Sequence, residues 1–214
     1  MINRLHYISQ GATAEAHLDN IRQACDAGCT WVQLRIKNET PANITPAAME
    51  ARRITQAYGA TLIINDHPQV AAACGADGVH VGLNDMSVAD ARLIVGPQAI
   101  VGGTSNKTAD ILKHSLEGAD YVGLGPFRFT ATKEKLSPVL GIDGYLSIME
   151  QLHILRLSIP VIAIGGILED DLPGLMQAGV HGVAISGLIT NAAVKSKMVA
   201  DLYSQLNNEN YATT

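Results

Sequence analysis

The sequence predicts a single α/β domain folded as a closed (β/α)8 TIM barrel, and three observations support this. Short apolar runs rich in β-branched residues alternate with helical patterns along nearly all of the 214 residues. Runs that are apolar at consecutive positions are typical of parallel strands buried on both faces. A junction in which a helix ends at a glycine just before a strand recurs along the chain. No Gly-x-Gly-x-x-Gly follows the first run, which disfavours the alternative, a doubly wound open sheet. We expect the barrel over residues 1–206 and a flexible tail over 207–214.

Eight apolar runs are the expected strands, and each is short enough to cross a compact barrel once. They are Leu5–Ile8, Trp31–Leu34, Leu62–Ile64, Gly78–Val81, Ala99–Gly102, Tyr121–Leu124, Val161–Ile164 and Val183–Ile185.

Helical patterns separate these runs. Thr45 and Pro46 predict a helix that begins at Pro46 and ends at Tyr58, because Thr is a good cap and Pro suits the first helical position. Ser87 predicts a cap for a helix over 88–95. The other helices are expected over 14–27, 68–74, 107–117, 143–156, 169–178 and 192–206.

A glycine ends a helix just before four of the strands. At each of these junctions we expect the left-handed conformation that glycine adopts without strain. The four residues are Gly28, Gly75, Gly118 and Gly179.

The composition indicates a globular protein. Hydrophobic residues make up 47%, charged residues 16%, and the formal net charge is -5. Because nucleic-acid binding is driven by neutralising phosphates, a mildly acidic chain disfavours it. The three cysteines lack metal-ligand spacing, so we expect buried thiols in a reducing compartment. No signal-peptide pattern and no membrane-length apolar run is present, so a cytoplasmic protein is expected.

Charged and polar residues follow the expected strands at the end where barrel enzymes carry their chemistry. Arg35 and Lys37 alternate after the second strand and so face one side of an extended chain. Asn65 and Asp66 follow the third strand, and Asp85 comes shortly after the fourth. Cations beside hard oxygen ligands favour Mg²⁺ held jointly with substrate phosphates. If these residues had no role in a reaction, the two aspartates would cap helices, and Arg35 and Lys37 would lie on a solvent-exposed face.

Small residues after the last two strands indicate a second anion site. Gly165-Gly166 follows the seventh strand and Ser186-Gly187 the eighth. Backbone N–H groups can approach a phosphate there, although the glycines could serve only tight turns. After the sixth strand, Thr130-Ala-Thr-Lys133 offers hydroxyls and an ammonium group to phosphate oxygens. Two anion sites predict a transfer between a diphosphate and a second substrate that carries one phosphate.

Several of these segments, in this order, resemble the thiamine-phosphate synthase family. The resemblance covers residues 5 to 190. It implies a TIM-barrel transferase that joins 4-amino-2-methyl-5-pyrimidinylmethyl diphosphate to 4-methyl-5-(2-phosphoethyl)thiazole, with Mg²⁺, giving thiamine phosphate and diphosphate. The shared motifs are Gln33-Leu-Arg-Ile-Lys37, Ile64-Asn-Asp66, Gly75-Ala-Asp-Gly-Val-His-Val-Gly-x-x-Asp85, Gly118-Ala-Asp-Tyr-Val-Gly-Leu-Gly-Pro126 with Thr130-x-Thr-Lys133, and Ile164-Gly-Gly-Ile167.

The resemblance also implies a role for each site residue. Gln33 would bind the pyrimidine, and Asp66 and Asp85 would bind Mg²⁺. The thiazole phosphate would be held by Gly166 and the backbone of Ile185 and Ser186, with Thr130 nearby. Residues that hold the leaving diphosphate would be Arg35, Lys37, Asn65, Thr104, Thr132 and Lys133. Among these, Arg35, Thr104 and Lys133 are the expected catalytic residues, because they stabilise the leaving group. In the family the C–O bond breaks before the thiazole nitrogen attacks, so no general base is required.

Four residues depart from the family pattern: Thr104 replaces the usual Ser, His67 the usual Arg, Leu83 a common Gln, and Asn106 a frequent His. These changes bear on substrate affinity and leave the charged members of the diphosphate site intact. His80 is interpreted as a packed strand residue rather than a base.

Two other functions fit the same barrel. A thiazole tautomerase would need the thiazole-phosphate site but no diphosphate residues. A noncatalytic phosphate-metabolite sensor would bind its ligands without turnover. The expected partners are small-molecule substrates, with no nucleic acid and no membrane, and an apolar barrel surface is compatible with a homodimer.

Overall fold

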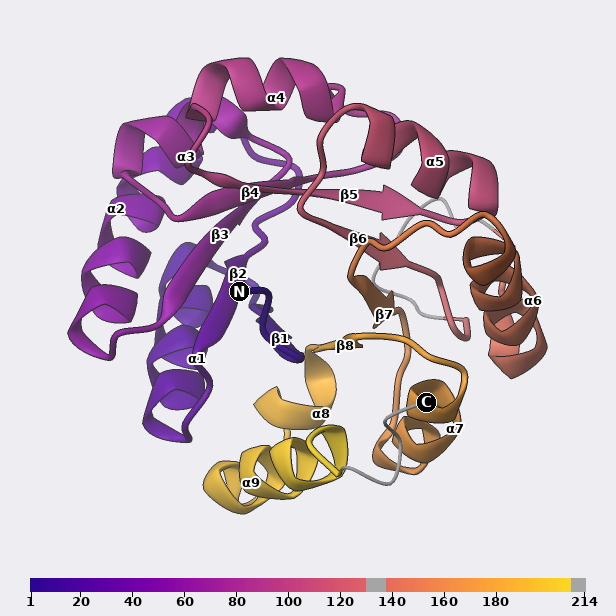
Figure 1. Ribbon diagram of the computed structural model, residues 1–214. Coiled ribbons are helices and arrows are strands. Elements are labelled where there is room, and N and C mark those ends of the chain that lie inside the picture. The colour runs from indigo at the N-terminus through magenta and orange to yellow at the C-terminus, as the bar shows by residue number, and fades with distance from the viewer. Residues whose placement is uncertain (130–137, 209–214) are drawn as a thin grey trace.

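The computed structural model describes residues 1–129 and 138–208, which form a closed barrel of eight parallel strands. Each strand pairs with the next along the chain, and β8 closes the barrel against β1. The predicted (β/α)8 architecture is confirmed, and Figure 1 shows the helices arranged around the strands. The strands are β1 (Leu5–Ile8), β2 (Trp31–Leu34), β3 (Thr61–Asn65), β4 (Gly78–Val81), β5 (Ile100–Ser105), β6 (Tyr121–Leu124), β7 (Val161–Ile164) and β8 (Gly182–Ile185).

Helices follow the strands as expected. The four junction glycines all have positive φ, between 64° and 102°, so their predicted left-handed conformation is confirmed. The helices are α1 (Ala14–Asp26), α2 (Pro41–Ala57), α3 (Pro68–Cys74), α4 (Val88–Val95), α5 (Thr108–Leu116), α6 (Gly141–Ile154), α7 (Leu172–Gln177), α8 (Gly187–Thr190) and α9 (Lys195–Leu206), with a 3-10 turn, η1 (Glu169–Asp171), before α7.

The predicted start of α2 was wrong. The helix begins at Pro41, because Thr40 caps it by accepting a hydrogen bond from the Asn43 N–H. The Thr45 hydroxyl instead donates to the Pro41 carbonyl at 2.7 Å, so Thr45 lies inside the helix. Pro46 is also inside it, at the sixth position, where it lacks the N–H that would donate to the Ala42 carbonyl. The expected helix over 192–206 corresponds to α9, which begins at Lys195, and the short helix α8 precedes it.

Strand β5 extends beyond its predicted end at Gly102 and includes Thr104. Glycines are weak strand formers, which hid this extension in the sequence. Their small size has a packing reason: a Cβ on Gly102 would clash with the Tyr121 ring, and one on Gly103 would lie 2.9 Å from His114 Cδ2. Thr104 therefore sits on the barrel wall itself, beside Gly123 of β6.

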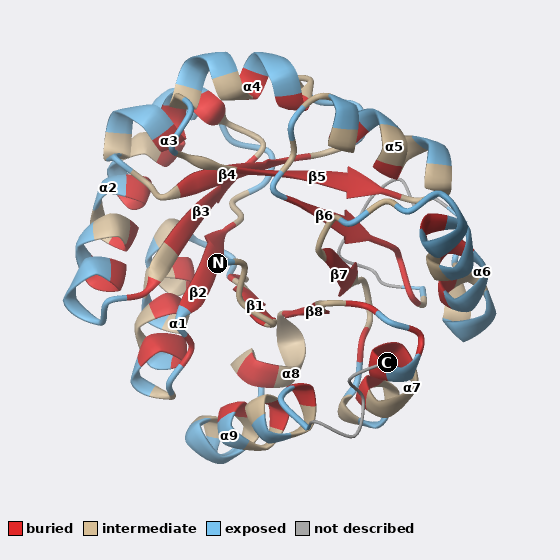
Figure 2. Ribbon diagram, in the orientation of Figure 1, coloured by how far each residue is buried: buried red, intermediate tan, exposed pale blue. Residues whose placement is uncertain are grey.

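Two apolar clusters make up the core. The larger one lies between the barrel and the surrounding helices, where Figure 2 shows the buried helix faces turned inward. The smaller one fills the barrel interior and includes Trp31 and Tyr121. His6 stacks on Trp31 at 4.4 Å between ring centroids, and Tyr121 packs edge-on against both rings. Burial lowers the pKa of His6 to about 3, which keeps it neutral inside this packing.

Candidate active site

A small cavity opens in the mouth of the barrel at the carboxyl ends of the strands. Its volume is about 50 Å³, and its polar lining residues include Gln33, Asn65, His80 and Thr104, from β2, β3, β4 and β5. We call it the central pocket. Arg35, just beyond β2, lines this pocket too. Four of the residues expected to bind the pyrimidine diphosphate therefore face one space.

Two larger cavities lie at the same end of the barrel. Arg35 also lines a cavity of about 400 Å³ between the loops after β7 and β8, which we call the glycine cup (Gly165–Leu168 with Ile185–Leu188). A cavity of about 480 Å³ is lined by Lys37, Asp66 and Asp85, and we call it the acidic groove.

The structure thus brings the described candidate residues to one rim of the barrel. Gln33, Arg35, Asn65 and Thr104 line the central pocket, Lys37, Asp66 and Asp85 the acidic groove, and Gly166, Ile185 and Ser186 the glycine cup. Thr130, Thr132 and Lys133 lie outside the described residues.

Arg35 lines both the central pocket and the glycine cup, and the next two residues of the chain line the acidic groove. Burial lowers the pKa of its guanidinium, while the charge of Asp66 acts in the opposite direction. Its backbone N–H donates to the Ser9 hydroxyl oxygen at 3.1 Å, and that hydroxyl is 2.8 Å from Nδ1 of the buried His17. The chain is therefore fixed where it leaves β2. A partly buried cation at such a point favours binding of an anion.

Asn65 presents an unused hydrogen-bond donor to the central pocket. Its side chain is 7% exposed, and Nδ2 has no hydrogen-bond partner within the described part of the chain. Buried polar atoms are nearly always paired in folded proteins, so an unpaired donor in a cavity wall indicates a ligand acceptor.

Thr104 takes part in a short chain of buried hydrogen bonds. Its hydroxyl is 3.0 Å from Nε2 of His80, whose Nδ1 is 3.0 Å from the Tyr121 hydroxyl. His80 is 7% exposed, and the structure agrees with its interpretation as a packed strand residue. The same contacts orient the Thr104 hydroxyl at the pocket wall.

The two aspartates of the acidic groove are close together, and their pKa values are shifted in opposite directions. Burial opposes ionisation of Asp66, but its hydrogen-bonded ion pair with Lys37 outweighs this and lowers the pKa of Asp66. Partial burial and the neighbouring charge of Asp66 raise the pKa of Asp85. Both carboxylates approach Gly82: a Cβ there would clash with Asp85 Oδ2 and lie 3.7 Å from Asp66 Oδ1. Such like-charge crowding is relieved by a bound cation.

The backbone of Asp66 is itself unusual. Its φ is 65°, a left-handed conformation that is uncommon for a residue with a side chain. Its N–H donates to the His80 carbonyl at 2.8 Å, which holds the residue in place. Strain of this kind is concentrated at functional sites.

The donor set of the acidic groove fits Mg²⁺. The carboxylates of Asp66 and Asp85 are hard oxygen ligands, and Mg²⁺ commonly takes only one or two protein carboxylates with substrate phosphates and waters. Within residues 1–129 and 138–208, no group of three or more His, Cys, Asp or Glu side chains could hold a metal. A metal here would therefore depend on a substrate for its remaining ligands.

Backbone geometry shapes the glycine cup. Gly165 and Gly166 have φ values of 91° and 72°, which only glycine adopts without strain. Ser186 precedes the short helix α8, and its hydroxyl donates to Gln10 Oε1 at 3.1 Å. Gln10 and Ser9 also line the cup. The sequence reasoning missed these two, although they directly follow β1 and the rule applied to the other strands would have identified them.

Asn106 has a structural role that the sequence did not reveal. Its Nδ2 donates to the Gly125 carbonyl and to the Pro138 carbonyl, both at 2.9 Å. These residues lie at the beginning and the end of the connection between β6 and α6. One side chain therefore joins the two ends of that connection next to the central pocket.

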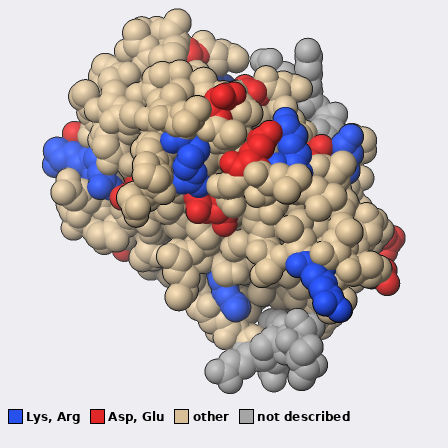
Figure 3. Space-filling view, turned by 45° about the horizontal axis from the view of Figure 1, so that its top comes forward, with Lys and Arg blue, Asp and Glu red and all other residues tan. Residues whose placement is uncertain are grey.

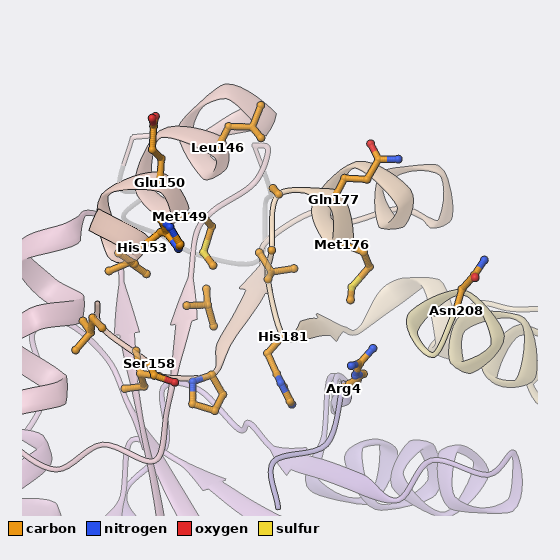
Figure 4. Close-up of a pocket in the computed structure, with 18 of the residues that line it drawn as sticks. Arg4, Leu146, Met149, Glu150, His153, Ser158, Met176, Gln177, His181 and Asn208 are labelled. Atoms are coloured by element: carbon orange, nitrogen blue, oxygen red, sulfur yellow. The ribbon is translucent and has the colours of Figure 1, made fainter. Parts of the chain in front are cut away.

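The opposite end of the barrel holds a cavity of different character. Its volume is about 990 Å³, and it lies between α6, α7 and the last turn of the chain (Figure 4). Arg4, His153 and His181 are among its lining residues. It is far from the strand ends that carry chemistry in such barrels.

On the face seen in Figure 3, basic side chains lie among acidic ones, so the two signs of charge are interspersed.

Comparisons with known proteins identify the family of this chain. A family model described as thiamine monophosphate synthase matches residues 5–189. The chain belongs to the thiamine monophosphate synthase family. The family assignment makes it an enzyme.

Individual relatives cover nearly the whole chain. A thiamine-phosphate synthase of Flavobacterium johnsoniae is 47% identical over 212 residues, which is 99% of this chain and 98% of that protein. One from Bacteroides fragilis is 43% identical over 88% of this chain and 92% of its own length. The solved structure of a thiamine phosphate pyrophosphorylase from Pyrococcus furiosus has a TM-score of 0.81 at 29% identity, covering 98% of this chain and 97% of that one.

None of the helices within the described residues combines the length and apolar character that a membrane crossing requires.

Proposed function

We propose that this enzyme joins 4-amino-2-methyl-5-pyrimidinylmethyl diphosphate to 4-methyl-5-(2-phosphoethyl)thiazole, releasing thiamine phosphate and diphosphate, with Mg²⁺ as cofactor. The observation that carries the proposal is the arrangement of two anion sites on one rim. The glycine cup shares Arg35 with the central pocket, and the acidic groove begins at the residue that follows Arg35. Two phosphorylated substrates bound there would meet at the barrel mouth, where their rings can be aligned.

The proposed diphosphate site combines donors from three strands. Arg35 and the Asn65 amide would donate to diphosphate oxygens from the pocket wall, and Thr104 would add its oriented hydroxyl. Lys37 now pairs with Asp66. With a metal on Asp66 and Asp85, its ammonium would be available to the diphosphate. Mg²⁺ bound there would neutralise negative charge that develops on the leaving group.

The proposed reaction is dissociative. The C–O bond breaks, both of its electrons leave with the diphosphate, and the pyrimidine amino group stabilises the remaining cation. The thiazole nitrogen then attacks with its own lone pair, so no protein group has to remove a proton first. This agrees with His80, whose ring nitrogens both make hydrogen bonds inside the protein. The task left to the chain is to hold charge and align two rings.

One assay tests this proposal directly. Purified protein is mixed with both substrates and Mg²⁺, and thiamine phosphate is detected by oxidation to a fluorescent product. Formation of thiamine phosphate is the expected result. Binding of both substrates without turnover would contradict it in favour of a sensor, and isomerisation of a thiazole phosphate without coupling would favour a tautomerase.

Two variants test the diphosphate site. Lys133→Ala and Asp85→Asn should each abolish most activity and leave the circular dichroism spectrum unchanged, because they remove leaving-group charge stabilisation. Lys197→Ala and Asp19→Asn are matched controls, since these side chains are 74% and 68% exposed on outer helices. Near-normal turnover of both site variants would contradict the proposed roles.

A further inference from the structure

The chain directly after β6 packs against the loop that forms the glycine cup. The Phe127 N–H donates to the Ile164 carbonyl at 2.9 Å, and the Arg128 N–H donates to the Gly165 carbonyl at 3.0 Å. The Arg128 guanidinium continues the series, because Nη1 donates to the Gly166 carbonyl at 2.6 Å. Three consecutive carbonyl groups of the cup loop are therefore bound by two consecutive residues.

Asp171 fixes the direction of the Arg128 side chain. Nη1 and Nη2 of Arg128 donate to the two oxygens of Asp171 at 2.6 and 2.9 Å, and the Asp171 side chain is only 13% exposed. Asp171 also accepts the Leu168 N–H at 2.7 Å, which fixes the carboxylate on the same loop. A bidentate pair of this geometry requires the planar guanidinium and cannot be reproduced by Lys.

The positions of these carbonyls determine where the N–H groups point. In a trans peptide the N–H is antiparallel to the C=O of the same unit. Binding of the Gly165 and Gly166 carbonyls by Arg128 therefore turns the N–H groups of Gly166 and Ile167 to the other side of the loop. Gly165, Gly166 and Ile167 all line the glycine cup. N–H groups of adjacent residues that point in the same direction form a concave anion-binding site.

Gly166 and Arg128 also fit each other sterically. A Cβ on Gly166 would clash with Arg128 Cγ and lie 3.2 Å from its Cδ. The absence of a side chain at Gly166 thus makes room for the Arg128 stem as well as permitting the φ of 72°. The Arg128 stem passes over Gly166, and this places the guanidinium beside the cup loop.

We propose that Arg128, held by Asp171, is a positioning residue that aims the N–H groups of Gly166 and Ile167 at the phosphate of the second substrate. Arg128 itself would not touch that phosphate, since its guanidinium binds the opposite side of the loop. The proposal rests on the proposed function for the identity of the substrate, while its binding chemistry, a phosphate monoester in a backbone cup, can be tested separately.

The test is an NMR titration of the ¹⁵N-labelled protein with inorganic phosphate. In the unmodified protein the amide signals of Gly166 and Ile167 should shift on phosphate addition. In Arg128→Met the same signals should lose this response, and phosphate affinity should fall about tenfold or more, as expected when aligned donors to an anion are lost. Asp171→Asn should produce the same loss, because Arg128 is then no longer held.

A matched control separates positioning from general stability. Arg53 makes the same bidentate contact with Glu50, at 2.8 and 2.6 Å, but within helix α2. Arg53→Met should leave phosphate binding within about twofold of the unmodified protein. Melting temperatures of all variants show whether each remains folded.

The outcomes distinguish this inference from the proposed function. The inference would be overturned if the Arg128→Met variant folds and binds phosphate as tightly as the unmodified protein. It would also be overturned if Arg53→Met lost as much phosphate affinity as Arg128→Met, or if the amide signals of Gly166 and Ile167 did not respond to phosphate in the unmodified protein. If phosphate binding depends on Arg128 but no thiamine phosphate is formed, the inference stands and only the proposed function fails. In active protein, the KM for the thiazole phosphate should rise in Arg128→Met, and Arg128→Lys should restore it only in part.

Discussion

The unused donor of Asn65 leads to a prediction in which stability and substrate binding change in opposite directions. Asn65→Leu keeps a side chain of similar size and removes the amide. Because Nδ2 is buried with no hydrogen-bond partner in the described part of the chain, the protein without substrate bears its desolvation cost. Leu would remove that cost, and at the same time it would remove a donor to the diphosphate.

The magnitudes follow from ordinary hydrogen-bond energetics. A buried unsatisfied donor costs about 1–3 kcal/mol. In a domain of 150–250 residues, 1 kcal/mol corresponds to about 2–4 °C in melting temperature. We therefore expect Asn65→Leu to melt about 2 °C or more above the unmodified protein. Loss of a hydrogen bond to a charged group, about 1.5–3 kcal/mol, would weaken binding of the pyrimidine diphosphate about tenfold or more.

Asn106, which directly follows β5, provides a matched control. Its Nδ2 makes two hydrogen bonds at 2.9 Å, so the same substitution breaks satisfied contacts. Asn106→Leu should therefore lower the melting temperature. Thermal unfolding without ligands, followed by calorimetric titration with the pyrimidine diphosphate, measures both effects.

The reasoning would be refuted by either of two results. If Asn65→Leu melts below the unmodified protein, as Asn106→Leu should, then the Asn65 amide is not a stability cost. If its affinity for the pyrimidine diphosphate is unchanged, then the amide does not bind that substrate.

Three other changes have definite expected outcomes. Gly166→Ala should destabilise by about 1–2 kcal/mol, because φ is positive there and a Cβ would clash with Arg128; unchanged melting and phosphate affinity would contradict this. Asp85→Asn should raise the melting temperature at neutral pH without Mg²⁺. The folded-state pKa of Asp85 is raised, so its destabilising effect is absent below the unfolded pKa, grows as pH rises from the unfolded to the folded pKa, and is complete above the folded pKa. The gain in melting temperature should therefore be larger at pH 7 than at pH 3. Adding Mg²⁺ with diphosphate should stabilise the unmodified protein more than this variant, and equal stabilisation would count against a metal at Asp85. Tyr145→Phe should lower stability by about 1–3 kcal/mol, because its buried hydroxyl donates to the Leu124 carbonyl and accepts the Ile164 N–H; an unchanged unfolding midpoint would exclude that role.

Much of the barrel could be predicted because its strands are buried on both faces. The boundaries of β1, β2, β4, β6 and β7 match the apolar runs, since nearly every position in them is buried and most of these positions are apolar. The errors occurred where local signals were ambiguous. Thr45-Pro46 and Thr40-Pro41 carry the same capping signature, and only packing selects the second pair. In β5 the glycines that accommodate Tyr121 and His114 conceal the strand.

The site was predictable in its location and less so in its energetics. Topology alone sends Arg35, Asn65 and Asp66 to one rim, because parallel strands of a barrel end on the same side. The charge states and contacts depend on distances that the sequence does not contain. Arg128 and Asp171 are 43 residues apart and carry no local pattern, so their contact with the cup became visible only in three dimensions.

The amide of Asn106 has a consequence for how this enzyme can vary. The Asn106 side chain holds Gly125 and Pro138 together. A change in the number of residues between them therefore adds little to the entropy cost of closing this connection. Exchanges between Arg128 and Pro138 should then disturb the barrel little, while they would change the proposed substrate residues Thr130, Thr132 and Lys133. Laboratory evolution aimed at new substrates would do best to keep Asn106, Phe127 and Arg128 unchanged, because their hydrogen bonds hold the connection on the barrel.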